Sequence, residues 1–410
     1  MKQRLNIAVI GLGHRASYLV SLLDKLHTNF QLKYVVDPNK DYSVSNLSKW
    51  EINHQNVEYF ADIETFLKFS HNVDGIIIGS PCNQHTTHAI NVKETGLPIY
   101  LEKPVATTFK QIEQLKNAYK TKEHLIVVSF PLSQTPLFKE VQNQIGYGKL
   151  GAINQVHSNN NVPYGALYYG YPSYRDYSVS GGLWLQKATH DFDYINKILG
   201  VPISITAMMN RSVYGGDMPK DLWCSKCDFI SSCTESPEFF TETGNSLAEM
   251  GDHQCVWAKD IIYQDAGSSL IMYESGAHAN YSQNFVSRFD AASRGARITG
   301  YNATILFDWY TNKISIIDHM NKSTEEIIIS NSDGHHGGDT SLLKNFADVC
   351  LGKDISNTDL NSGLLSAAMC LSAKKACHEQ SYISIGSIDS SKFPYPENPP
   401  VKTPINLEPV

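Results

Sequence analysis

The chain has 410 residues, 42% of them hydrophobic and 18% charged, and its formal net charge is −7. This length allows two or three domains with large cores, and the ordinary balance of apolar and charged residues excludes wholesale disorder. The acidic balance argues against a nucleic-acid partner, and no run of about 18 apolar residues predicts a membrane-spanning helix.

The first apolar run, LNIAVIGLG at residues 5–13, follows basic residues, as the core of a secretion signal would. The run is short, glycine interrupts it and no small-residue cleavage site follows, so we interpret it as a β-strand. We therefore expect a cytoplasmic protein whose eight cysteines are mostly reduced thiols or metal ligands.

Residues 1–127 alternate short apolar runs with amphipathic stretches. Apolar runs that alternate with helical segments predict parallel strands covered by helices on both faces, a doubly wound α/β sheet. The expected strands lie at residues 5–13, 31–37, 73–81, 97–104 and 124–131, with helices at 16–26 and 85–96.

Residues 128–390 follow a different pattern, in which alternating segments near residues 152–162, 269–285, 294–300 and 312–318 predict a large, mainly antiparallel sheet. Helical segments near residues 184–199, 340–352 and 364–380 make this an α+β domain. A cysteine-containing insertion at about 215–256 interrupts it, and the proline-rich tail 391–410 is expected to be extended.

A glycine loop follows the first strand. Gly11, Gly13 and Ala16 form a G-x-G-x-x-A pattern at the start of a helix, which suits a pyrophosphate beside His14 and Arg15. Asp37 ends the second strand, where a carboxylate can bind ribose hydroxyls and repel a 2′-phosphate. We therefore expect NAD rather than NADP, although Arg15 could offset that repulsion. The alternative is an ordinary strand–turn–helix.

Two further turns follow strands of the same sheet. Glu102-Lys103-Pro104 comes after the strand at 97–101, and Lys103 should project towards the nucleotide, although a solvated surface lysine is the alternative. The segment SPCNQH at 80–85 follows an earlier strand.

The glycine loop, SPCNQH and Glu102-Lys103-Pro104 follow one another in this order along the chain. Together they resemble the Gfo/Idh/MocA family of oxidoreductases, which includes glucose–fructose oxidoreductase and inositol dehydrogenase. The resemblance runs from residue 5 to about 385. It implies that cofactor-binding residues also include Ser80, Pro81, Asn83, His85 and Glu102.

A helix with many titratable groups lies within GGLWLQKATHDFDYI at 181–195. On a helical wheel Lys187, His190 and Asp191 share one arc, and histidine suits acid–base work near neutral pH. The alternative is a solvated polar face with a structural histidine.

The family resemblance makes His190 the acid–base residue and Lys103 the group that positions the substrate hydroxyl. The chain departs from the family pattern at Gln186, where an aspartate is usual. Its own pattern, K-x-x-H-D from Lys187 to Asp191, resembles a distinct branch of the family. Lys187 or Asp191 would then orient His190.

The candidate substrate wall is rich in tyrosine. The stretch 161–177 includes Tyr164, Tyr174 and Arg175, and Trp184 follows. Such residues suit the faces and hydroxyl rims of sugars, but tyrosine clusters also occur at subunit interfaces. The resemblance implies that His336, in the run HHGGD, contacts the substrate. The alternative for this run is the start of a helix, which Asp339 would cap.

The insertion contains Cys224, Cys227, Cys233 and Cys255. Their spacing could close a structural Zn²⁺ site of four thiolates, and independent free thiols are the alternative.

The leading hypothesis is an NAD-dependent oxidoreductase that transfers hydride between a nicotinamide cofactor and a hydroxyl of a sugar, sugar derivative or cyclitol. Redox-assisted glycoside hydrolysis without net redox is one alternative, and a non-catalytic nucleotide or sugar sensor is another. The resemblance also implies a homodimer or homotetramer assembled through the open face of the second sheet.

Overall fold

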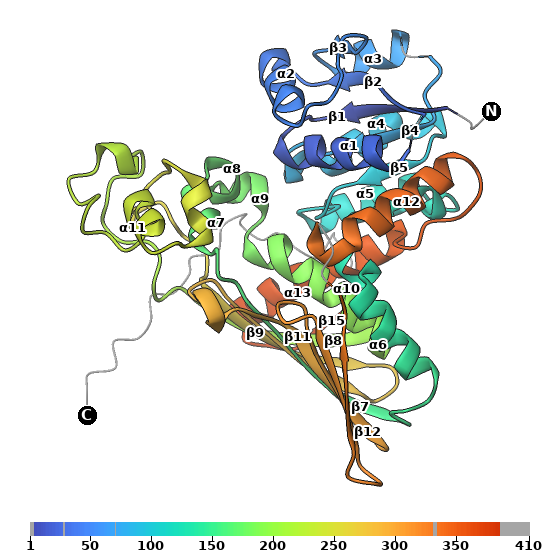
Figure 1. The fold of residues 1–410 in the computed structure, drawn as a ribbon, viewed down its shortest axis with the longest axis vertical. Helices are drawn as coiled ribbons and strands as arrows, with labels where there is room; N and C mark the ends of the chain where they lie inside the picture. The colour runs from blue at the N-terminus through green and yellow to red at the C-terminus, as the bar shows by residue number, and fades with distance from the viewer. Residues whose placement is uncertain (1–3, 28, 70, 331–333, 386–410) are drawn as a thin grey trace. The chain divides into compact units, whose positions relative to one another are not determined.

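A computed structural model describes residues 4–27, 29–69, 71–330 and 334–385, and the chain forms two compact units (Figure 1). The first unit comprises Met1–Lys139, Phe192–Tyr194 and Asn331–Ala368, and the second comprises Glu140–Asp191, Ile195–Ser330 and Met369–Val410. The sequence predicts a single boundary near residue 127, whereas the first unit also takes residues from late in the chain. The predicted tail 391–410 lies outside the described residues.

The first unit is built on a parallel sheet of six strands in the order β3-β2-β1-β4-β5-β6. The strands are β1 Leu5–Ile10, β2 Phe30–Val36, β3 Glu58–Phe60, β4 Gly75–Ile78, β5 Ile99–Leu101 and β6 Ile126–Val128. Its helices are α1 His14–Leu26, α2 Lys40–Lys49, α3 Ile63–Phe69, α4 His85–Val92, α5 Phe109–Ala118 and α12 Gly338–Cys350, and α6 Pro136–Gly146 begins in it. The predicted doubly wound sheet is confirmed.

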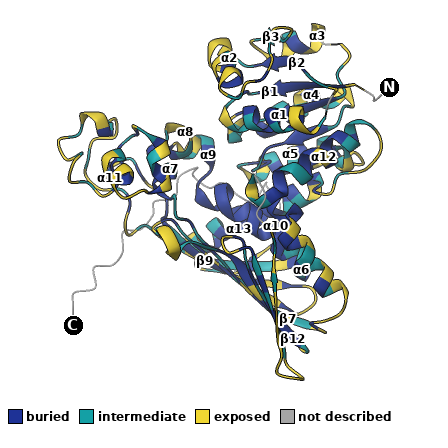
Figure 2. Cartoon of the chain, viewed as in Figure 1, coloured by how far each residue is buried: buried dark blue, intermediate teal, exposed yellow. Residues whose placement is uncertain are grey.

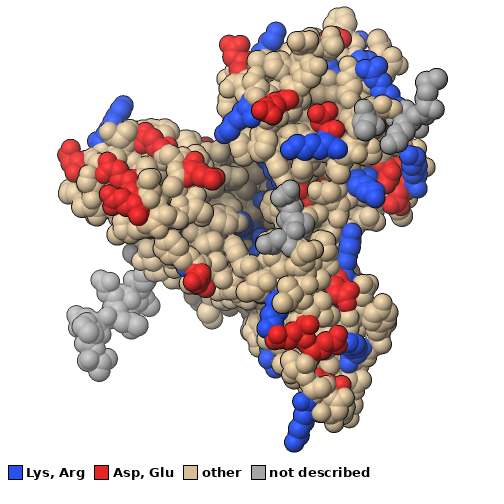
Figure 3. Space-filling view, viewed as in Figure 1, with Lys and Arg blue, Asp and Glu red and all other residues tan. Residues whose placement is uncertain are grey.

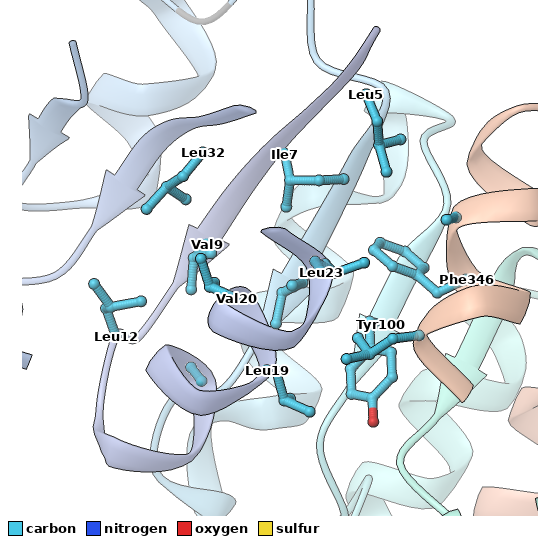
Figure 4. Packing of buried hydrophobic residues seen from close by; sticks show 14 of the residues in the cluster. Leu5, Ile7, Val9, Leu12, Leu19, Val20, Leu23, Leu32, Tyr100 and Phe346 are labelled. Atoms are coloured by element: carbon cyan, nitrogen blue, oxygen red, sulfur yellow. The ribbon is translucent and has the colours of Figure 1, made fainter. Parts of the chain in front are cut away.

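Helix α12 belongs to the first unit because its apolar side chains complete that unit's core. Leu342, Leu343 and Phe346 are fully buried in the same cluster as Leu5 of β1 and Tyr100 of β5 (Figure 4). The ring centroids of Phe346 and Tyr100 lie 5.7 Å apart in an edge-on arrangement. Burial of each side chain of this size stabilises the fold by roughly 1.5–3 kcal/mol. This burial favours packing of α12, although it comes late in the chain, against the first sheet.

The second unit contains a nine-stranded sheet in the order β14-β13-β12-β11-β7-β10-β9-β8-β15. The strands are β7 Ile153–Asn161, β8 Pro202–Asn210, β9 Ala266–Tyr273, β10 His278–Asn284, β11 Ser293–Gly300, β12 Ala303–Asp308, β13 Lys313–Asp318, β14 Thr324–Ile328 and β15 Ile383–Ser384. Strands β7 and β10 pair in parallel and the other neighbouring pairs are antiparallel, so the predicted mainly antiparallel sheet is confirmed.

One face of this sheet is covered and the other is open. Along β9, buried and exposed residues alternate as the period of a strand requires. The outward side chains include Met208, which is 80% exposed, together with Leu270 and Met272. This open face is the surface on which the homo-oligomer is predicted, and the oligomer stays a prediction.

The remaining helices are α7 Ala166–Gly170, α8 Pro172–Arg175, α9 Tyr177–Ser180, α10 Thr189–Leu199, α11 Pro237–Glu242 and α13 Leu360–Glu379, with a π-helix at Trp184–Ala188 directly before α10. Helices α10 and α13 are buried over most of their length (Figure 2). In the described part of the chain, no helix combines the length and the apolar character needed to cross a membrane.

Candidate active site and cofactor site

The glycine loop joins β1 to α1 and leaves the N-terminus of that helix open. Gly11 has φ +78°, and a Cβ there would lie 2.4 Å from Cα of Ser80, so only glycine fits. A Cβ at Gly13 would meet nothing within 4 Å. Gly13 is the N-cap of α1 and provides no side chain to satisfy the first backbone N–H groups. These groups can therefore bind the phosphates of a dinucleotide.

Asp37 lies directly after β2, beside this loop. Its carboxylate accepts hydrogen bonds from the backbone N–H groups of Leu12 and Asn39, each at 2.9 Å. The side chain is half-buried, so the bonds fix its orientation and leave part of it accessible. Asp37 is therefore placed to accept hydrogen bonds from ribose hydroxyls.

Arg15 connects the glycine loop to two motifs that lie far from it in the sequence. Its Nε lies 3.0 Å from Oε1 of Glu102, and its two terminal nitrogens lie 2.9 and 2.5 Å from the carboxylate oxygens of Asp339. Asp339 also pairs with His335, whose Nδ1 lies 2.8 Å from Oδ2. Burial raises the pKa of Asp339, but His335 and Arg15 outweigh that effect and hold it well below its usual range.

This ion-pair network determines what two acidic side chains do. Asp339 does not cap α12, because Gly337 is the N-cap and the carboxylate pairs with Arg15 instead. Glu102 anchors its turn by accepting hydrogen bonds from Arg15 and from the Ser129 hydroxyl at 3.0 Å.

His85 is a buried link between two turns. Its Nδ1 lies 2.8 Å from the carbonyl oxygen of Pro104, and its Nε2 lies 2.7 Å from that of Ser80. Burial lowers the pKa of His85, and the two carbonyl oxygens oppose this effect because they accept hydrogen bonds from ring N–H groups. His85 thus positions the turn that carries Lys103, which is itself half-buried.

The other predicted cofactor residues are distributed around these turns. His14 packs its ring edge-on against Trp50, and Ala16 is buried against Gly79. Pro81 is exposed, and the carbonyl of Asn83 accepts a hydrogen bond from Gln111. His336 is half-buried in the turn before α12, with φ +56°.

In the second unit, Lys187 lies on the π-helix and is only 7% exposed. Its Nζ donates to the Tyr164 hydroxyl at 2.7 Å and lies 4.5 and 5.2 Å from the ring centroids of Tyr164 and Tyr168. Burial lowers the pKa of Lys187, and the nearby guanidinium of Arg294 lowers it further. The π-helix has a wider turn than the α-helix that the sequence predicted for this segment, and the shared arc of Lys187, His190 and Asp191 stays a prediction.

Asp191 is fully buried and its carboxylate is already satisfied. It accepts two hydrogen bonds from Arg294, at 2.9 and 3.0 Å, one from the Tyr281 hydroxyl at 2.8 Å and one from the Asn160 amide at 3.0 Å. These donors lie on β11, β10 and β7, so Asp191 fastens the start of α10 to three neighbouring strands of the sheet. The structure thus gives Asp191 an anchoring role. Its predicted orientation of His190, which precedes it and is 5% exposed, stays a prediction.

Two predicted substrate residues are structural. Arg175 is 6% exposed and pairs with Asp260, at 2.9 Å from Nε, while it donates to the carbonyl of Cys255 at 2.8 Å. Trp184 is fully buried, 5.9 Å from the Tyr281 ring. Both predictions are therefore corrected, because these side chains hold the unit together. Tyr164 and Tyr174 remain half-buried, as residues of a substrate wall require.

Sequence analysis missed Arg294 and Tyr281, which satisfy Asp191. Each lies in a segment that was recognised only as a strand, and neither belongs to a short motif. Arg294 stands in the mixed segment SRGARITG, which gives no signal of the partner that the arginine has.

The four insertion cysteines line one cavity of about 320 Å³ together with His253. Cys224 Sγ lies 3.7 Å from both ring nitrogens of His253, and the Trp257 indole donates to Cys233 Sγ at 3.4 Å. Figure 3 shows acidic side chains on the outer surface of this segment, around α11, whereas Cys224 and Cys255 are buried. Among the described residues, no three histidine, cysteine, aspartate or glutamate side chains already form the ligand set of a metal ion.

Zinc binding at these thiols stays a prediction. We expect the native mass of the purified protein to exceed that of the polypeptide by one zinc ion, because four thiolates can replace its water ligands. Cys227→Ser should lose the added mass, whereas the control Cys377→Ser, on α13, should keep it. A parent mass without metal, together with a melting temperature that chelator leaves unchanged, would establish independent free thiols.

The parallel sheet, the open helix N-terminus at Gly13 and the carboxylate of Asp37 after the second strand are typical of a dinucleotide-binding fold. A profile described as "Oxidoreductase family, NAD-binding Rossmann fold" matches residues 5–130, and the GFO/IDH/MocA C-terminal domain matches residues 138–306. The chain therefore belongs to the Gfo/Idh/MocA family of oxidoreductases and uses a nicotinamide cofactor.

Several relatives support this assignment. The chain is 24% identical to the Bacillus subtilis protein named as oxidoreductase YteT, over 85% of this chain and 89% of that one. It is 22% identical to the B. subtilis NAD⁺-dependent scyllo-inositol 2-dehydrogenase, over 50% of this chain and 56% of that one. A levoglucosan dehydrogenase solved with NADH and levoglucosan has the same fold, with a TM-score of 0.73, 15% identity and coverage of 93% of this chain and 100% of that one.

Proposed function

We propose that the protein is an NAD-dependent dehydrogenase of a ring hydroxyl in a sugar, sugar derivative or cyclitol. The observation that carries the proposal is the open N-terminus of α1 at Gly13 beside the oriented carboxylate of Asp37. Two of the similar proteins are named for polyhydroxylated ring substrates, scyllo-inositol and levoglucosan.

The preference for NAD over NADP follows from two charged side chains. Asp37 would repel a 2′-phosphate at the ribose, and Arg15 is committed to Glu102 and Asp339 and so does not offset this repulsion. Arg15 therefore gives no reason to expect NADP in place of NAD.

Asp37→Ser should therefore weaken NAD⁺ and improve NADP⁺, changing the ratio of their kcat/KM values by at least about tenfold, or ~1.4 kcal/mol. Asp41→Ser is the matched control, because it removes the same charge from an exposed position on α2. The measurement is nicotinamide absorbance with each cofactor. An Asp37→Ser ratio equal to that of the control would contradict the assignment of Asp37 to the ribose.

The chemistry requires two groups to leave the substrate carbinol. Bound NAD⁺ supplies the hydride acceptor. His190 is proposed to take the hydroxyl proton, because imidazole exchanges protons near neutral pH, and Lys103 is proposed to hold the hydroxyl oxygen. His85 supports Lys103 indirectly, through the carbonyl of the adjacent Pro104.

The test combines the purified protein, NAD⁺ and a panel of sugars, sugar acids, glycosides and cyclitols. We expect nicotinamide reduction with one class and an oxidised product by mass. Cleavage of a glycoside without net reduction of NAD⁺ would reject the dehydrogenase and support redox-assisted glycoside hydrolysis. NAD⁺ binding with no product from any class would favour a sensor.

A further inference from the structure

Lys187 and Tyr164 form a buried cation–phenol pair on the second unit. The ammonium of Lys187 donates to the phenol oxygen at 2.7 Å, and that ring also lies beneath it, with the centroid 4.5 Å away. Asp191 attracts Lys187 as well, but its carboxylate is already paired with Arg294 through two hydrogen bonds. Tyr164 is therefore the group that receives the lysine charge most directly.

The phenol oxygen of Tyr164 has a second partner, Tyr310. The two hydroxyls are hydrogen-bonded, and burial together with this bond and the neighbouring charges raises the pKa of Tyr310 well above its usual range. Tyr310 thus keeps its proton and acts as the donor. An ammonium and a phenol that both donate to one oxygen stabilise its anionic form, the phenolate.

Lys187 and Tyr164 differ in how far they are exposed to solvent. Lys187 is 7% exposed and is covered by the rings of Tyr164 and Tyr168, whereas Tyr164 itself is half-buried. Tyr164 is therefore the partly exposed member of the pair, and Lys187 is the covered one. Tyr168 is also buried, and burial raises its pKa, so its phenol stays protonated.

We propose that Tyr164 is a further catalytic residue, an acid–base group that acts in addition to His190 and is held ready by Lys187 and Tyr310. The inference rests on the proposed dehydrogenase function and assigns part of its proton transfer. In the oxidation, the Tyr164 phenolate takes the single proton of the substrate hydroxyl and becomes phenol, and His190 then receives this proton from the phenol, which restores the phenolate. The substrate O–H bond breaks, a carbonyl forms, and the carbinol hydride passes to the nicotinamide of NAD⁺. Reduction runs these steps in reverse.

The kinetic test compares three variants in the oxidation direction. Tyr164→Phe should lower kcat about 100-fold, since acid–base groups contribute factors of this size. Lys187→Met should move the rising limb of the kcat–pH profile to higher pH by about one unit or more, because it removes the nearby positive charge. Tyr301→Phe is the matched control, because it removes the hydroxyl of a tyrosine that is 73% exposed and outside this cluster, and it should leave both kcat and the profile near those of the parent.

An NMR titration tests the pair without turnover. With ¹³Cζ-labelled tyrosine, the Tyr164 signal is assigned by its loss in Tyr164→Phe, and its ionisation is followed with pH in the parent and in Lys187→Met. Tyr310→Phe, at a residue that is 39% exposed, gives a second variant that should fold and should shift the titration in the same direction by less.

The outcomes separate this inference from the proposed function. Turnover that His190→Ala abolishes but Tyr164→Phe leaves unchanged would retain the dehydrogenase and overturn the role of Tyr164. A Tyr164 titration that neither Lys187→Met nor Tyr310→Phe moves would also overturn it, whether or not a substrate is found. A Tyr164 titration that both variants shift upwards, in a protein with no turnover, would retain the activated phenol and reject the dehydrogenase.

Discussion

Asp191→Ala is expected to lower the free energy of unfolding by about 3–5 kcal/mol, the cost of breaking a buried ion pair by removing one partner. Arg294 would remain buried with its charge uncompensated, and the Tyr281 hydroxyl and Asn160 amide would each lose an acceptor. Urea denaturation followed by circular dichroism measures the change.

Two further variants show whether the ion pair causes the loss. The double substitution Asp191→Leu with Arg294→Met removes both charges and should recover much of the stability, because apolar replacements often equal a buried pair. Asp290→Ala removes an exposed carboxylate and should have little effect. An Asp191→Ala protein as stable as the Asp290→Ala protein would show that the network adds no stability.

His190→Ala is expected to lower kcat by about 10²–10⁴-fold while NAD⁺ affinity stays near that of the parent. The reason is that the imidazole is proposed to exchange the hydroxyl proton, whereas the residues expected to hold the cofactor lie in the first unit. Turnover with the identified substrate and fluorescence titration with NADH measure the two quantities separately.

The matched control for this substitution is His278→Ala, which removes an exposed histidine at the start of β10. It should retain parental turnover. Equal kcat values for His190→Ala and His278→Ala would exclude His190 as an acid–base residue. A melting temperature near that of the parent is required of each variant, because His190 is buried.

Local patterns were sufficient for the two sheets and for the glycine loop. Short apolar runs between amphipathic helices determine a parallel sheet, since both of its faces must be covered, and alternation predicts half-exposed antiparallel strands. Gly11, Gly13 and Asp37 were proposed as cofactor residues because their spacing and chain position carry the signal, and the matched Rossmann segment, residues 5–130, contains all three.

The partners of the charged residues were not predictable in this way. Arg15 and Asp339 are separated by 324 positions, and Asp191 and Arg294 by 103. Lys187 shows the same limit over a shorter distance, since Tyr164, which accepts its hydrogen bond, lies 23 positions earlier in the chain.

The sequence by itself therefore determined the fold class, the nicotinamide cofactor and the family, because these depend on periodicity and on residues that act close to one another in the chain. Only the tertiary structure decided which charged side chains form ion pairs within the protein and which remain available to a ligand. It assigned Arg15 to two carboxylates, Asp191 to Arg294 and Lys187 to Tyr164. The physical reason is that a buried charge must be matched by whatever group the fold brings beside it, and that group can come from any point in the chain.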